Sequence, residues 1–473
     1  MNILFITGSL DYTDPIKPLG HWIDIRMGIS YISSVLKLNG HNTDLLVLGL
    51  KDKEKLIDKT VKEFNPKLIC FTALATEYDF ISKTAGYIKM KYPGIYLIAG
   101  GPHVSLNPDE VIKDPFDALC IGEGEYPVLE LVEQLEKDQK PSRIKNLWIK
   151  QGREIEKNPV RDFLQDLGKL PFPDRKIWAK CIKDVKSTQP VLIGRGCPFR
   201  CTYCCNHVLA GLARGRYVRL MSPGNILKEI KDLLRLFPNS SCIYFEIETI
   251  GVNTEFALNL CSELEEFNRT VKNKLSYGAN LRIIPGVDYS GLFNSLKKAN
   301  FEFVNIGLES GNGRIREEIL KRRYSNEDII KAVKQARVAG LKVNLYMMVG
   351  LPTETPCDFK ETIQCARECS PDEARLGIFY PYPGTELYNL CEEQGLISNN
   401  SYTGMERKKA FLDLPGFSRH KIQKEFDWFY YNIYKGRRPL LSNIIYCLKG
   451  IISRNMPPKI LNMTRSLINN LRG

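Results

Sequence analysis

Three cysteines share one short segment of the chain, and their spacing suits metal chemistry. Cys197, Cys201 and Cys204 follow the pattern Cys-x3-Cys-x2-Cys, directly after the apolar run 191–193. Three thiolates held close together suit a [4Fe–4S] cluster in which one iron has no protein ligand. A small molecule can bind at that open iron and receive an electron there, so the segment predicts a redox-active site.

Two other uses of these cysteines have to be weighed. Cys205 and His207 lie nearby, so a zinc site of three cysteines and one histidine is an alternative. Short zinc motifs, however, usually contain paired Cys-x2-Cys units with a second pair or a histidine at a set distance. A disulfide is disfavoured because nothing else in the sequence resembles a secreted protein. The spacing therefore favours an iron–sulfur cluster.

The composition of the 473-residue chain is that of an ordinary globular protein, with 43% hydrophobic and 26% charged residues. Its length predicts two or three domains. The first residues lack the pattern of a signal peptide, and no apolar run approaches the ~18 residues that span a bilayer. The 14 cysteines show no disulfide rhythm, so we expect a cytoplasmic protein.

Short apolar runs alternate with amphipathic stretches up to about residue 140, which predicts a parallel α/β sheet. The expected strands are 3–7, 44–48, 68–72, 96–99 and 118–121, and the expected helices are 27–38, 53–64, 79–91, 108–112 and 126–136. This pattern predicts a doubly wound domain of about five strands. The segment 146–190 contains Pro171 and Pro173, and it reads as an irregular connector with one short hairpin.

Three conspicuous loops follow the third, fourth and fifth of these strands. They read Thr72-Ala73-Leu74-Ala75-Thr76, Gly100-Gly101-Pro102-His103 and Gly122-Glu123-Gly124-Glu125. Ligands of doubly wound sheets bind beyond the carboxyl ends of the strands, where glycine lets the backbone approach a bulky ligand. In this order, the loops resemble the cobalamin-binding domain that precedes many radical S-adenosylmethionine (SAM) enzymes. The resemblance assigns cobalamin contacts to Thr72, Gly100, Gly101, His103, Gly122, Glu123 and Gly124.

One departure from cobalamin domains concerns the cobalt ligand. The Asp-x-His-x-x-Gly motif of the methionine-synthase type is missing, and the loop after the first strand reads Gly8-Ser9-Leu10-Asp11-Tyr12-Thr13. Radical SAM members commonly lack that histidine. We therefore assign none of His21, His41 and His103 as a cobalt ligand, although cobalamin can still bind.

A second set of strands and helices follows the connector. Strands are expected at 191–195, 243–247, 275–279, 303–306, 343–349 and 374–379, and helices at 223–236, 255–268, 326–339 and 357–368. Six such units form a partial (β/α)6 barrel. The cysteine segment follows the first strand, at the carboxyl end where parallel barrels hold their active sites.

Four further segments resemble motifs of the radical SAM superfamily. The segments 305–311 and 244–249 end the fourth and second strands, and the segments 346–355 and 380–388 end the fifth and sixth. The resemblance assigns SAM contacts to Tyr203, Glu248, Gly307, Glu309 and Ser310. Ile247 replaces an acidic residue that relatives often carry, which leaves Glu246 as an alternative to Glu248, and Thr353 replaces a usual glycine.

The resemblance also implies a reaction. Cys197, Cys201 and Cys204 would hold the catalytic [4Fe–4S] cluster, which reduces SAM to methionine and a 5′-deoxyadenosyl radical with electrons from a flavodoxin or ferredoxin type of reductant. With cobalamin as methyl donor, the leading reaction is C-methylation of an unactivated carbon in a small-molecule or lipid-linked substrate. A cobalamin-dependent or cobalamin-independent rearrangement, ring contraction or oxidative cyclisation is the alternative.

The net charge of +13 is concentrated at the end of the chain, where residues 435–473 contain eight Lys or Arg and no Asp or Glu. Helices are expected at 440–453 and 459–471, separated by Pro457-Pro458. Their mixed basic and apolar pattern predicts contact with a membrane surface or a partner, or a solvated helix packed on the barrel. An RNA-binding or tRNA-modifying protein is the alternative of another class. We expect no nucleic acid, because the chain lacks the second cysteine domain and RNA-binding barrel of the methylthiotransferases.

The predicted fold class is α/β, in four parts. A Rossmann-like cobalamin-binding domain is expected at 1–145 and a connector at 146–186. A partial radical SAM barrel is expected at 187–396, and a mostly helical basic extension at 397–473.

Overall fold

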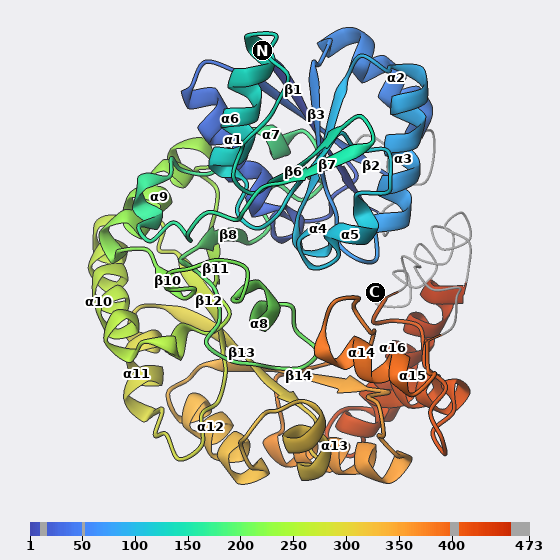
Figure 1. Ribbon diagram of the computed structural model, residues 1–473. Coiled ribbons are helices and arrows are strands. Elements are labelled where there is room, and N and C mark those ends of the chain that lie inside the picture. Colours follow the sequence, from blue (N-terminus) through green and yellow to red (C-terminus); the bar gives the residue numbers. More distant parts are fainter. Residues whose placement is uncertain (10–16, 50–52, 398–405, 456–473) are drawn as a thin grey trace.

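The structure is a computed structural model that describes residues 1–9, 17–49, 53–397 and 406–455 (Figure 1). Two sheets organise it, one in each half of the chain. The first has seven strands in the order β2-β1-β3-β4-β5-β6-β7, and the second has six in the order β15-β14-β13-β12-β11-β8.

The first sheet is parallel over its first five strands. These are β1 (Asn2–Gly8), β2 (Asn42–Leu48), β3 (Leu68–Thr72), β4 (Tyr96–Gly100) and β5 (Ala118–Cys120). The connecting helices are α1 (Met27–Leu38), α2 (Lys53–Phe64), α3 (Tyr78–Lys91), α4 (Pro102–Leu106), α5 (Pro108–Val111) and α6 (Glu125–Glu136). The five strands lie close to their expected positions, as do α1, α2, α3 and α6.

Alternate residues of β1 explain why helices cover both faces of this sheet. Ile3 and Phe5 enter one core together with side chains of α1 and α6, whereas Leu4 and Ile6 enter another with α2 and α3. A strand that is buried on both faces reads as a continuous apolar run, as β1 does over residues 3–6. Figure 1 shows α1 and α6 on one side of the sheet and α2 and α3 on the other.

A hairpin extends the first sheet beyond the expected five strands. β6 (Leu147–Gln151) pairs antiparallel with β5, and β7 (Glu154–Lys157) pairs antiparallel with β6. The expected domain boundary at residue 145 therefore falls before two strands that belong to this sheet. The sequence predicted a hairpin in the connector, but its pairing with β5 depends on contacts between distant segments.

The connector binds the two halves together after this hairpin. Its short helix α7 (Lys176–Ala179) buries Trp178 in the first domain, where the indole Nε1 donates to Ser30 Oγ at 2.8 Å. Arg175, just before α7, pairs with Glu229 of the second domain at 2.6 Å, and both side chains are buried. Removing one partner of such a pair leaves an uncompensated buried charge, which is strongly destabilising.

The second sheet is parallel throughout and forms an open barrel. Its strands are β8 (Gln189–Leu192), β11 (Cys242–Glu246), β12 (Ser276–Leu281), β13 (Phe301–Glu309), β14 (Lys342–Val349) and β15 (Glu373–Ile378). The helices α9 (Pro223–Leu236), α10 (Thr254–Thr270), α11 (Ser290–Lys298), α12 (Asn326–Val338), α13 (Pro356–Cys369) and α14 (Glu386–Glu393) belong to this half. In Figure 1, α9 to α13 follow the outer arc of the strands. The predicted partial (β/α)6 barrel is confirmed.

Two helices follow the barrel strands. α15 (Arg419–Tyr434) packs on β15 and on α13, and α16 (Leu440–Asn455) packs on α15. The expected helix at 440–453 corresponds to α16, whereas the one expected at 459–471 lies outside the described residues. In the part of the chain that the structure describes, no helix is long and apolar enough to cross a membrane.

Candidate active site

One cavity of about 2310 Å³ lies between the two halves of the chain, and Cys197, Cys201 and Cys204 all line it. The cysteine segment is held in place by β9 (Gly194–Arg195), which pairs antiparallel with β10 (Arg219–Leu220). Gly196 adopts a positive φ of 86°, and a Cβ atom there would lie 2.3 Å from the carbonyl oxygen of Tyr217. Only glycine fits this close approach, so the turn that presents Cys197 depends on it.

Two of the three sulfur atoms accept a hydrogen bond from a neighbouring side chain. Arg282 donates through Nη1 to Cys201 Sγ at 2.7 Å, and its guanidinium lies 3.7 Å from the ring centre of Phe199. Asn206 donates through Nδ2 to Cys204 Sγ at 3.5 Å. Hydrogen bonds to the sulfurs are one means by which proteins tune an iron–sulfur cluster, so these residues fit that group.

The surroundings of the thiols affect their ionisation differently. Hydrogen bonding from Cys205, opposed by burial, lowers the pKa of Cys204 to about 7, whereas burial raises the pKa of Cys197 to about 11. Within the described ranges, no three His, Cys, Asp or Glu side chains converge to hold a single metal ion. A cluster binds its thiolates at separate corners, so it does not require such convergence.

Glu309 is the carboxylate at the end of β13, and two neighbours fix it. Arg322 donates through Nη1 to Glu309 Oε1 at 2.8 Å and to the hydroxyl of Tyr203 at 2.8 Å. That hydroxyl in turn donates to Glu309 at 3.2 Å. Tyr203, Glu309 and Arg322 all line the cavity, and Tyr203 lies between two of the cysteines in sequence. The arrangement holds a carboxylate beside the cysteine loop.

Glu248 follows β11 and also lines the cavity. Its Oε1 atom accepts a hydrogen bond at 3.0 Å from Asn206, the same residue that donates to Cys204. Asn206 is itself oriented by Tyr217, whose hydroxyl donates to Oδ1 at 2.7 Å. The sequence placed Glu248 and the cysteines near one another, and the structure links them through Asn206.

Comparison with known families agrees with this geometry. A family model described as the radical SAM superfamily matches residues 191–366, and one described as the B12 binding domain matches residues 23–132. The chain is a cobalamin-binding radical SAM enzyme. The resemblance drawn from the motifs is confirmed, and so are the expected cofactors, namely a [4Fe–4S] cluster, SAM and cobalamin.

Relatives of this radical SAM enzyme extend over most of its length. An uncharacterized methyltransferase of Pyrococcus horikoshii is 25% identical over 90% of this chain and 92% of its own. The anaerobic magnesium-protoporphyrin IX monomethyl ester cyclase of Cereibacter sphaeroides is 23% identical over 77% of this chain and 60% of its own. The solved structure of the cobalamin-dependent SAM radical enzyme OxsB, with aqua-cobalamin and SAM bound, covers 99% of this chain and 75% of its own, with a TM-score of 0.69 and 15% identity. That likeness shows the shared fold.

Two residues that the sequence assigned to SAM lie in different surroundings in this radical SAM enzyme. Gly307 lines the cavity, and a Cβ atom there would lie 2.4 Å from Glu309 Oε1, so glycine leaves room for the carboxylate. Ser310 is fully buried. Its hydroxyl lies 3.4 Å from Thr362 Oγ1 and accepts from the backbone N–H of Asn312 at 3.2 Å. Ser310 is therefore packed behind the end of β13.

The seven residues assigned to cobalamin lie at or just beyond the carboxyl ends of β3, β4 and β5, as expected. Gly101 has a φ of 101°, and a Cβ atom there would lie 2.9 Å from Thr72 Oγ1. His103 is buried beside Tyr78 with ring centres 4.4 Å apart, and burial lowers its pKa to about 4. None of these seven is among the described residues that line the large cavity, to which the first domain contributes other residues, such as Thr76, Asp79 and Phe80.

Glu123 makes contacts that the sequence did not predict. Its carboxylate accepts hydrogen bonds from Arg195 at 2.9 Å, from Arg219 at 3.0 Å and from the backbone N–H of Leu164 at 3.2 Å. Although burial opposes ionisation, the hydrogen bond from Arg219 and the charge of Arg195 lower the pKa of Glu123. Both oxygens are therefore hydrogen-bonded to the connector and to the second half of the chain.

Sequence reasoning missed a row of polar side chains on the barrel strands, of which Asn280, Asn305 and Tyr244 line the cavity. Asn280, Asn305 and Asn344 are aligned on adjacent strands, and Asn305 connects the other two through hydrogen bonds of 3.0 and 2.9 Å. Tyr244 donates to Asn280 at 2.6 Å. Amide side chains within apolar strands were the available signal. Their alignment required the strand register, which single-sequence reasoning does not supply.

Proposed function

We propose that this radical SAM enzyme methylates an unactivated carbon of a small-molecule substrate. The observation that carries the proposal is the large cavity, which the cysteine loop of the barrel and the helix α3 of the first domain line together. A substrate within it would lie beside the cysteine loop and beside Thr76 of the loop after β3, one of the loops assigned to cobalamin. The methyltransferase relative, which matches almost the full length of the chain, supports the same reaction.

The geometry supports the following assignment of residues to the cofactors. Cys197, Cys201 and Cys204 would bind the cluster, and the loops after β3, β4 and β5 would bind cobalamin. Glu248 and Glu309 would accept hydrogen bonds from SAM. When bound, the three groups supply one-electron cleavage of SAM and a methyl donor, with electrons from an external flavodoxin or ferredoxin type of reductant.

The side chains of the enzyme prepare this site in three ways. Arg282 orients Cys201, and Asn206 orients both Cys204 and Glu248. Arg322 holds Glu309 in a fixed position. Solvent has little access to this pair, because the Arg322 side chain is 5% exposed and the Glu309 side chain 14%. Fixed polar groups in a site of low solvent access lose little reorganisation energy when a charged ligand binds.

Ring formation or rearrangement is the second candidate, supported by the relative named as a cyclase. It uses the same cluster and SAM site. The two reactions differ in the fate of the methyl group of SAM, because only methylation transfers that group to the substrate.

The test follows that methyl group. Anaerobically reconstituted enzyme receives cobalamin, a chemical reductant and SAM labelled in its methyl group, and corrinoid and nucleoside products are analysed by mass spectrometry. We expect labelled methylcobalamin together with 5′-deoxyadenosine. Formation of 5′-deoxyadenosine without label on the corrinoid would contradict methyl transfer and favour the second candidate.

We also propose that the basic extension at the end of the chain contacts a membrane surface. The described part of the basic extension exposes the apolar side chains of Leu440, Leu441, Ile445 and Leu448 on α16. Exposed apolar residues near basic ones suit the interface of an anionic bilayer. Flotation with phosphatidylserine vesicles tests the contact: we expect co-flotation that Leu441→Glu reduces several-fold, and recovery in the bottom fraction would contradict it.

A further inference from the structure

The cavity wall formed by β15, the segment 406–410 and the helices α15 and α16 is rich in cationic side chains. They are Arg375, Arg407, Lys408, Arg438 and Arg454. The carboxylates that line the same wall are Asp372, Glu373 and Asp427. This wall is distinct from the cysteine loop and from the strand end that carries Glu309.

Arg375 and Arg454 form close ion pairs with carboxylates of this wall. Arg375 donates to Glu373 through Nη2 at 2.7 Å, and Arg454 pairs with Asp427. Arg438 stacks on the ring of Tyr434, with its guanidinium carbon 3.9 Å from the ring centre, and donates to the carbonyl oxygen of Asp372 at 3.0 Å. These contacts give the three arginines structural partners.

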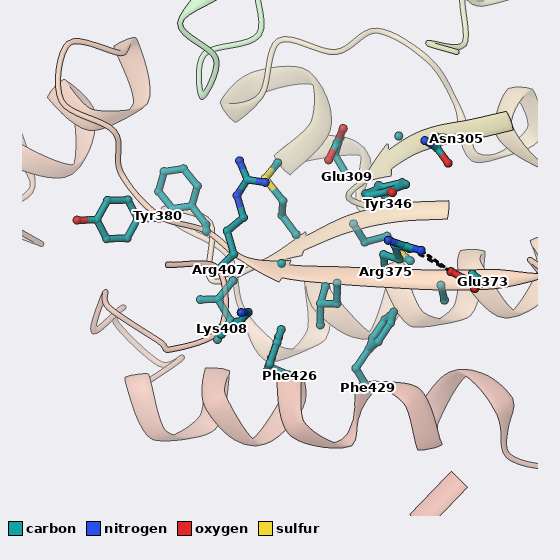
Figure 2. A pocket seen from close by; sticks show the side chains of 18 of the residues that line it. Asn305, Glu309, Tyr346, Glu373, Arg375, Tyr380, Arg407, Lys408, Phe426 and Phe429 are labelled. Carbon is teal, nitrogen blue, oxygen red and sulfur yellow. Dashed lines mark hydrogen bonds and ion pairs between the residues drawn. The ribbon is translucent and has the colours of Figure 1, made fainter. Parts of the chain in front are cut away.

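Arg407 differs from these three because its charged end faces the cavity. Its side chain is 67% exposed and lines the cavity, into which it extends in Figure 2. Among the described residues, the contacts of its guanidinium involve Nε, which donates to the Tyr382 hydroxyl at 3.2 Å and lies 3.8 Å from Glu406. Nη1 and Nη2 have no hydrogen-bond or ion-pair partner among the described residues, and a guanidinium matches a carboxylate or phosphate with two parallel hydrogen bonds.

The backbone holds Arg407 in a strained conformation. Its φ is 61°, in the left-handed region that a long side chain rarely adopts, and its carbonyl oxygen accepts from the N–H of Ile378 at 2.8 Å. This bond fixes the segment to the end of β15, where the Arg407 side chain passes close to Gly377. Strained residues persist where the surrounding structure fixes them, and they are concentrated at functional sites.

Apolar side chains line the cavity on the same wall. Phe426 and Phe429 of α15 lie below Arg407 in Figure 2, and Tyr380 also lines the cavity. We propose that Arg407 binds the carboxylate or phosphate of an amphipathic substrate whose apolar part packs on Phe426 and Phe429. The proposal rests on the proposed function, because it names the class of molecule that accepts the methyl group.

Binding of simple amphiphiles tests the proposal without catalysis. Equilibrium dialysis of the reconstituted enzyme measures decanoate, decyl phosphate and decanol, which share one apolar chain. We expect at least one of the two anions to bind about tenfold more tightly than decanol, which corresponds to about 1.4 kcal/mol. Preference for decanoate or for decyl phosphate identifies the acidic group. Equal binding of all three would overturn the proposal.

Two variants locate the effect. Arg407→Asn is chosen because asparagine tolerates the left-handed conformation, so the backbone is retained. We expect it to abolish the preference for anions while decanol binding is unchanged. Lys183→Gln removes one positive charge elsewhere in the same cavity, and we expect it to keep the preference. An equal loss in both variants would show a diffuse effect of charge and overturn the specific site.

One further arm separates the substrate from SAM, which carries a carboxylate of its own. Saturating SAM should leave decanoate binding by the wild-type enzyme within about twofold, because we place SAM at Glu248 and Glu309. Competitive displacement of decanoate would assign Arg407 to SAM and overturn the proposal. These measurements record binding alone, so failure of the methyl-transfer assay and failure of this inference remain distinguishable.

Discussion

Arg195 donates through Nη1 to Oε1 of Glu123 at 2.9 Å, across the interface between the two halves of the chain. Glu123 lies in the loop after β5, where cobalamin is expected, and Arg195 lies two residues before Cys197. Arg195 also donates to Glu125, and Arg219 donates to Glu123. The loops expected to bind the two metal cofactors are thus connected directly by largely buried ion pairs.

Glu123→Gln should weaken this interface. It removes the negative charge between two largely buried arginines, so we expect the free energy of unfolding to fall by about 2–4 kcal/mol. Urea titration of the anaerobic enzyme measures the loss. Glu130→Gln is the matched control, because Glu130 pairs with Arg161 in the same domain but is 44% exposed. We expect a loss below about 1 kcal/mol there, and equal losses would contradict the interface role.

The cysteine assignment makes a prediction about iron content. Alanine at Cys197, Cys201 or Cys204 should each reduce bound iron after anaerobic reconstitution from about four atoms per chain to below about one, since three thiolates hold the cluster. Cys205→Ala is the control and should keep nearly full iron content. Loss of iron from Cys205→Ala, or bound zinc in place of iron in the wild type, would contradict the assignment.

The contacts of Glu309 predict an effect on SAM binding. Glu309→Gln keeps the shape of the side chain but removes its charge, and we expect SAM affinity to fall about tenfold, or about 1.4 kcal/mol. Equilibrium dialysis with labelled SAM measures it in the cluster-loaded enzyme. Glu302→Gln, at an exposed position of the same strand, should bind SAM normally. Unchanged affinity in Glu309→Gln would move the SAM contact elsewhere.

Glu246 makes stability depend on pH. Burial, together with the charge of Glu248, raises the pKa of Glu246 to about 7 from an ordinary 4.5. Between these values the folded protein binds more protons than the unfolded chain, so stability falls as pH rises through this window. We expect the free energy of unfolding of Glu246→Gln to exceed that of the wild type by about 1–3 kcal/mol at about pH 8. At about pH 4 the two free energies should be equal. Urea titrations at both pH values measure the difference, and a constant difference would contradict the raised pKa.

The sequence predicted those features of the fold and the site that depend on residues close together in the chain. Apolar runs bounded by glycine located the parallel strands, and the cysteine spacing located the expected cluster loop, because both depend on neighbouring residues. Arg282 and Arg322, by contrast, reach Cys201 and Glu309 from other strands and loops. Such contacts depend on strand register and on the closure of the barrel, which no local pattern specifies.

Glu123 is a residue whose position in the fold was predicted from the sequence but whose contacts were not. Its loop lies at the carboxyl edge of the first sheet, as expected, yet its carboxylate accepts from Arg195 and Arg219. The docking of one domain on another determines these contacts. A single sequence shows the glycines on either side of Glu123 but not the arginines that it meets.

The most direct test of the account is the metal and corrinoid content of the anaerobically purified and reconstituted enzyme. Iron, sulfide and corrinoid analysis with an optical spectrum should give about four irons and one corrinoid per chain, as one cluster and one cobalamin require. Four irons without corrinoid, even after growth and reconstitution with cobalamin, would contradict the methyl-transfer mechanism and leave a radical enzyme that does not use cobalamin.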